Sequence, residues 1–116
     1  MRIGIFIDSQ RLDEFVQRVH DVKERGFASA WAPQIFGLDA LTALAVAGRE
    51  VPDLELGTSV VPTYPRHPSA LASTALTAQE ATGGRITLGI GLSAIDARSS
   101  LDDVCRAVAS RCNLVH

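Results

Sequence analysis

The stretch LELGTSVVPTYPRHPSALASTALTAQEATGGRITLGIGL, residues 54–92, decides the fold. It opens with β-branched and apolar residues that run up to a proline, a pattern typical of a buried strand. Pro68 stands where a helix can begin, and a pair of glycines stands where that helix ends. A second apolar run closes the stretch. We therefore expect a strand, a helix and a strand over residues 54–61, 68–81 and 86–92.

The residues before this stretch show the same alternation. An apolar run at residues 3–7 is followed by apolar side chains three and four apart over residues 12–22, which predict a helix with one buried face. A run at residues 27–32 ends at a proline, and Asp39 can cap a helix that extends to residue 49. Strands that alternate with helices form parallel sheets with right-handed crossovers. The sequence therefore predicts an α/β fold with four parallel strands and three intervening helices.

The end of the chain departs from this alternation. Residues 94–116 contain one further helix pattern, over residues 100–111, whose apolar face we expect to cover part of the sheet. We therefore divide the chain into a domain of residues 1–93 and a divergent tail of residues 94–116. The two outer strands of such a sheet have open edges, and open edges favour self-association.

Composition excludes several classes of function. Apolar residues make up 47% of the 116 residues and charged residues 21%, which is typical of a globular chain. The net charge of −2 provides no attraction to nucleic acid or to an anionic membrane. No apolar run approaches the roughly 18 residues of a membrane span, so we expect a cytoplasmic protein. Cys105 and Cys112 lie too far apart in one helix for a disulfide, and no metal site is predicted.

The loop after the third predicted strand carries chemically varied side chains. Ligands of parallel α/β folds gather at the carboxyl ends of the strands. Tyr64, Arg66 and His67 follow this strand between prolines that stiffen the loop. They could form a wall for a planar or anionic ligand. Alternatively, the loop is simply rigid, with His67 near a helix start.

A glycine pattern follows in the fourth strand. Gly89, Gly91 and Ala94 fit the G-x-G-x-x-A pattern of dinucleotide-binding proteins, which makes a small NAD(P)-binding protein one hypothesis. However, no helix begins directly after the pattern. The alternative is that the glycines permit close approach of a neighbouring backbone or a flat ligand.

Three strings together resemble one enzyme family. They are WAPQIFGLDALT at residues 31–42, LGTSVVP at 56–62 with RHP at 66–68, and GGRITLGIG at 83–91. They look like the second, third and fourth strand regions of luciferase-like oxidoreductases that use coenzyme F420, a 5-deazaflavin. The resemblance implies that residues 1–93 are the N-terminal half of a (β/α)₈ barrel, truncated before the barrel closes.

The resemblance also implies a cofactor and a set of site residues. The cofactor is coenzyme F420, or FMN as the alternative, and the reaction is hydride transfer at carbon 5 of the deazaflavin ring to or from a small organic substrate. A cis peptide bond is implied between Ser59 and Val60. The implied cofactor-binding residues are Ser59, Val60, Gly91 and Ser93, and the residues lining the substrate side are Gln34, Phe36 and Tyr64.

The departures from the family leave catalysis unassigned. Relatives place a polar residue beyond the fourth strand and a histidine near the end of the second. The matching positions here are Ala94 and Gln34, neither of which can act as a base. The loops that hold the cofactor phosphate in the family follow the fourth strand. We therefore expect weak cofactor binding by this chain, and the alternative from another class is a non-catalytic remnant or interaction module.

Overall fold

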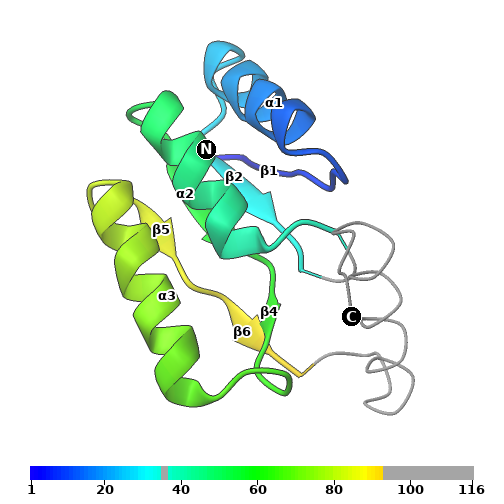
Figure 1. The fold of residues 1–116 in the computed structure, drawn as a ribbon. Coiled ribbons are helices and arrows are strands. Elements are labelled where there is room, and N and C mark those ends of the chain that lie inside the picture. Colours follow the sequence, from blue (N-terminus) through cyan, green and yellow to red (C-terminus); the bar gives the residue numbers. More distant parts are fainter. Residues whose placement is uncertain (35–36, 93–116) are drawn as a thin grey trace.

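The computed structural model describes residues 1–34 and 37–92. Strands and helices alternate along the chain (Figure 1). The tail helix predicted over residues 100–111 and both cysteines lie outside the described residues. The elements are β1 (Gly4–Phe6), α1 (Leu12–Glu24), β2 (Ser29–Ala32), α2 (Ala40–Glu50), β3 (Glu55–Thr58), β4 (Val61–Pro62), α3 (Pro68–Ala81), β5 (Ile86–Thr87) and β6 (Ile90–Gly91).

The main sheet has four strands in the order β1-β2-β3-β5, and every neighbouring pair is parallel. The predicted α/β fold with parallel strands is therefore confirmed. Register partners on the four strands form one row of apolar residues across the sheet, and most of their side chains are buried. Residues in register in a parallel sheet share a face, so this row defines the face that the helices cover. The row consists of Ile5, Ala30, Leu56 and Ile86.

The third and fourth predicted strands are each interrupted, which corrects the prediction of continuous strands over residues 54–61 and 86–92. The first break coincides with a cis peptide bond between Ser59 and Val60. The segments after the breaks, β4 and β6, pair in parallel as a second sheet of two strands. The sequence reads as continuous because residues on both sides of each break are β-forming types.

The helices pack according to the predicted spacing. On α1 the buried residues are Phe15, Val16, Val19 and Val22. Helix α2 packs closely at Gly48, where a Cβ would lie 2.4 Å from Thr82 at the end of α3 and 2.9 Å from Leu56 of β3. Helix α3 lies beside α2 at the end of the layer and buries little (Figure 1).

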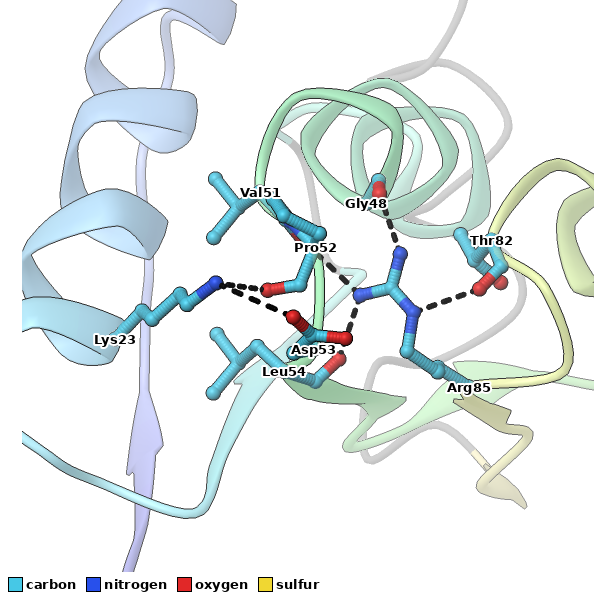
Figure 2. A network of polar contacts seen from close by, with 8 residues as sticks. All are labelled: Lys23, Gly48, Val51, Pro52, Asp53, Leu54, Thr82 and Arg85. Atoms are coloured by element: carbon cyan, nitrogen blue, oxygen red, sulfur yellow. Dashed lines mark hydrogen bonds and ion pairs between the residues drawn. The ribbon is translucent and has the colours of Figure 1, made fainter.

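The turn after α3 brings Arg85 back against the end of α2. Gly83 and Gly84 have φ angles of 64° and 85°, a conformation that glycine adopts without steric cost. The guanidinium of Arg85 then donates hydrogen bonds to four backbone carbonyls, as Figure 2 shows. The acceptors are the oxygens of Thr82 at 2.7 Å, Val51 at 3.0 Å, Leu54 at 2.8 Å and Gly48 at 2.5 Å.

The turn between α2 and β3 is also held from its other side. Lys23, at the end of α1, donates a hydrogen bond to the carbonyl of Pro52 at 2.5 Å and lies 4.0 Å from the carboxylate of Asp53 (Figure 2). Arg85 and Lys23 thus tie the ends of all three helices to one turn. This turn lies at the amino end of β3, opposite the carboxyl ends where ligands bind in such folds.

Replacing Arg85 by lysine tests this network. We expect Arg85→Lys to lower the free energy of unfolding by roughly 2–4 kcal/mol, because a lysine ammonium cannot span four carbonyls as the planar guanidinium does. Urea unfolding followed by circular dichroism measures the change. The control is Arg49→Lys, at an exposed position in the last turn of α2, which should change stability by less than about 0.5 kcal/mol. Equal unfolding midpoints for the two variants would contradict the role of Arg85.

Candidate functional site

The candidate site lies where β3 and β5 break, at their carboxyl ends. The hydroxyl of Thr58 donates to the carbonyl of Gly89 and accepts from the N–H of the same residue, both at 2.8 Å. Thr58 is 1% exposed. A Cβ at Gly89 would lie 2.1 Å from the carbonyl oxygen of Thr58, so the two backbones can approach this closely only with glycine there. The glycine pattern of the fourth strand therefore serves close backbone approach.

The bulge that follows brings three predicted cofactor-binding residues together. The Ser59–Val60 bond is cis, which confirms the expectation drawn from the family resemblance. The N–H of Ser59 donates to the carbonyl of Ala32 at 2.8 Å, which ties the bulge to β2. Val60 is 40% exposed, and a Cβ at Gly91 would lie 3.0 Å from its Cγ2. The fourth predicted residue, Ser93, lies outside the described residues.

The residues predicted for the substrate side lie on two different loops. The side-chain oxygen of Gln34 accepts from the N–H of Ala40 at 3.1 Å, which holds this partly buried amide at the start of α2. Tyr64 is 68% exposed on the loop between β4 and α3. Phe36 lies outside the described residues. The two described residues therefore lie on separate loops, and Tyr64 is largely exposed to solvent.

An ion pair that the sequence did not predict joins these loops. Asp39 caps α2, because its Oδ2 accepts from the N–H of Thr42 at 3.1 Å and from its hydroxyl at 2.6 Å. Its other oxygen accepts from the guanidinium of Arg66. Burial acts to raise the pKa of Asp39, but the hydrogen bonds from Thr42 and Arg66 outweigh burial and lower this pKa. The charged carboxylate is therefore favoured in the folded chain.

The two interpretations of the proline-rich loop are now distinguishable. His67 is the N-cap of α3, and its Nδ1 accepts from the N–H of Ser69 at 3.2 Å. Arg66 is engaged with Asp39. The structure places His67 at a helix start, as the second interpretation has it, and both side chains that could bind an anion already have internal partners.

Trp31 provides a feature of the open face of the sheet that the sequence did not predict. Its indole N–H donates to the hydroxyl of Ser29 at 2.8 Å. A Cβ at Gly57 would lie 2.3 Å from the ring, and one at Gly4 would lie 2.6 Å from it. The indole therefore lies flat across two neighbouring strands, on the face opposite the helices. The signal in the sequence is a pair of glycines on the two neighbouring strands, and it becomes visible once the register is known: Gly57 is the register partner of Trp31, and Gly4 is the register partner of Ser29.

A small hollow opens beside this site, between the loops that follow β1 and β2. Its volume is about 170 Å³. The walls are mostly apolar, and the polar side chains come from the loop after β1. Such a composition suits a small organic molecule. The lining residues include Ile7, Asp8, Ser9, Gln10, Phe15, Pro33 and Leu38.

Comparisons with known proteins agree on one family. The model of the luciferase-like monooxygenase family matches residues 1–103. A protein of Mycobacterium tuberculosis named as a coenzyme F420-dependent oxidoreductase is 33% identical over 96 residues, which make up 80% of this chain and 28% of that protein.

Solved structures agree with the fold. Coenzyme F420-dependent tetrahydromethanopterin reductase from Methanopyrus kandleri superposes with a TM-score of 0.70 at 22% identity, over 89% of this chain and 29% of that one. The oxygenating constituent of 3,6-diketocamphane monooxygenase from Pseudomonas putida, solved with FMN, gives 0.77 at 17% identity, over 94% and 38%. The chain thus has the fold of half a (β/α)₈ barrel, as predicted, and spans well under half the length of these relatives.

Within residues 1–34 and 37–92, no cluster of three or more histidine, cysteine, aspartate or glutamate side chains could hold a metal ion. In the same part of the chain, no helix combines the length and the apolar character that a membrane span needs.

The contact between Thr58 and Gly89 predicts a difference between two glycine variants. We expect Gly89→Ala to lower the free energy of unfolding by roughly 1–3 kcal/mol, because its methyl group meets a backbone oxygen that cannot move aside cheaply. Gly91→Ala should cost clearly less, since its methyl group meets the end of the Val60 side chain. Thermal unfolding of both variants measures the difference. An equal loss in both would show that the close approach at Gly89 does not hold the bulge.

The ion pair of Asp39 predicts a pH dependence. Its lowered pKa means that its contribution to stability is fully present above the unfolded-chain pKa of about 3.9 and is lost as the pH falls through the folded-chain pKa. Asp39→Asn keeps a capping side chain but loses the charge, so it should cost at most about 1 kcal/mol at neutral pH. The stability difference between the native chain and the variant, measured by urea unfolding, should shrink below pH 4. A difference that grows on acidification would refute this assignment.

Proposed function

Because the chain belongs to the luciferase-like monooxygenase family, we propose that it carries the ring-binding half of an oxidoreductase site. The reaction is hydride transfer between coenzyme F420, with FMN as the alternative cofactor, and a small organic substrate. The names of the M. tuberculosis and M. kandleri relatives support F420, and the P. putida structure with FMN supports the alternative. The observation that carries the proposal is the shared break of β3 and β5, which leaves apolar surface exposed at Val60 beside Gly91.

The residues of the bulge fit a flat, largely apolar ring. Val60 and Ile90 are 40% and 55% exposed, so apolar surface is available beside the break in the sheet. Gly91 has no side chain to obstruct a ring, and Ser59 offers an exposed hydroxyl. Ser93 belongs to the same proposed set by its place in the sequence. When bound, the deazaflavin supplies carbon 5 of its ring as the hydride donor or acceptor.

The substrate is proposed to lie on the side of Gln34, Phe36 and Tyr64. The oxygen of Gln34 is used by Ala40, but an amide side chain keeps two N–H donors that can orient a substrate carbonyl or hydroxyl. Gln34 cannot remove a proton at neutral pH, so its role is positioning. The hollow beside Pro33 adds apolar contact for a small organic group.

The described residues contribute little to binding a cofactor phosphate. Arg66 is paired with Asp39, and His67 caps α3. Several charge-assisted hydrogen bonds of roughly 1.5–3 kcal/mol each would otherwise hold the phosphate. We therefore propose that this chain recognises the ring and that the phosphate is bound by other segments of the complete site.

Titration with cofactors that differ only in the phosphate tests the proposal. Riboflavin and FMN should bind the 116-residue chain with equally weak affinity, as measured by fluorescence, and F420 should gain no affinity from its phosphate-bearing tail. Val60→Asp should weaken ring binding at least about tenfold, or 1.4 kcal/mol, since it places a charge against the ring. The control Leu76→Asp, at a 70% exposed position on α3, should leave binding unchanged.

Three outcomes would count against the proposal. FMN binding at least 100-fold tighter than riboflavin would reveal a phosphate site, with Arg66 and His67 the first residues to replace. Binding of NADH without binding of any flavin or deazaflavin would favour a dinucleotide-binding protein. Absence of binding by every ring compound would favour a non-catalytic interaction module.

A further inference from the structure

The main sheet of the described residues ends on two strands that each have one neighbour. β1 pairs with β2 alone, and β5 pairs with β3 alone. A strand in a parallel sheet presents backbone N–H and C=O groups on both edges, so the outer edges of β1 and β5 lack a partner strand. The N–H of Ile86, for example, points to the outer edge, away from β3. There it donates a hydrogen bond to the side-chain oxygen of Gln79 at 2.7 Å.

Apolar side chains accompany both open edges. Phe6, in β1, is 57% exposed. On the other side, the exposed fractions are 37% for Leu88, between β5 and β6, 55% for Ile90, in β6, and 88% for Leu92, just after β6. Large apolar side chains grouped at a sheet edge mark an interaction surface. Among the described residues, the two edges thus share two properties, the lack of a neighbouring strand and exposed apolar side chains.

We propose that the partner on these edges is a second copy of this chain. A two-fold axis parallel to the strands places β5 of each copy beside β1 of the other, and every strand then remains parallel to its neighbours. Two sheets of four strands give eight, which is the number at which parallel barrels close with an interior filled by side chains. Closure removes all open edges at once, because the two junctions are identical.

The regular spacing of the strands along the chain allows a second copy to continue the same sheet. The strands of the main sheet begin at residues 4, 29, 55 and 86, so each strand with its helix occupies at least 25 residues. A second copy supplies four strands with the matching edges.

The proposed junctions have defined contacts. Phe6 of one copy would lie against the apolar side chains along β5 and β6 of the other, and the partner strand would replace Gln79 as acceptor for Ile86. The carboxyl ends of all eight strands would meet on one rim, so both candidate sites would face the same side. The inference rests on the sheet and its edges and does not depend on the proposed cofactor.

Light scattering coupled to size-exclusion chromatography tests the inference on the 116-residue chain. The native chain should elute as a dimer over about 1–100 μM, a range that covers micromolar dissociation constants. Phe6→Lys and Ile90→Lys should each give monomers in that range, and circular dichroism should show that both remain folded, since both positions are exposed. The matched control Leu76→Lys, on α3, should remain dimeric.

Three results would overturn the inference. They are a monomeric native chain at every concentration, assemblies that grow beyond two copies, and loss of the dimer in Leu76→Lys while both edge variants keep it. Growth beyond two copies contradicts the proposal because a closed pair leaves no edge for a third copy. If either edge variant unfolds, the other variant still decides the question.

Discussion

The two hydrogen bonds between the Thr58 hydroxyl and the backbone of Gly89 determine the shape of the upper part of this molecule. One buried hydroxyl joins the two strands where β3 and β5 both stop: it accepts from the N–H of Gly89 and donates to its carbonyl, which also accepts from the N–H of Val61. Because both strands break at the same level, they can resume together as β4 and β6. The bulge at Ser59–Val60, the position of Gly91 and the path of the proline-rich loop all follow from that shared break.

The opposite end of the sheet is organised by two cationic side chains. Arg85 satisfies carbonyls at the end of α2, in the turn before β3 and at the end of α3, so three segments depend on one guanidinium. Lys23 adds α1 to the same turn. Carbonyls at helix ends lack partners within the helix, and here a side chain supplies them. These hydrogen bonds hold the segments at this end of the sheet together. The chemically varied side chains lie on the loops at the other end.

The loops at the carboxyl ends are also held to one another. The pair of Asp39 and Arg66 joins the loop that begins α2 to the loop that precedes α3, with Asp39 also capping its own helix. These contacts use the cation and the imidazole that an anionic ligand would otherwise attract. The described half of the site therefore offers a shaped apolar surface with few charges, which suits a planar ring better than a phosphate.

The sequence by itself determined the alternation of strands and helices, the buried face of α1, the cap at Asp39 and the family to which the chain belongs. These features depend on neighbours in the chain: side-chain spacing, proline and glycine at helix ends, and local strings such as LGTSVVP. The sequence did not reveal the double break in the strands, the reach of Arg85, the pair of Asp39 and Arg66, or the position of Trp31 across Gly57. Each of these joins residues distant in sequence or depends on strand register, so only the tertiary structure brings the partners within hydrogen-bond or contact distance.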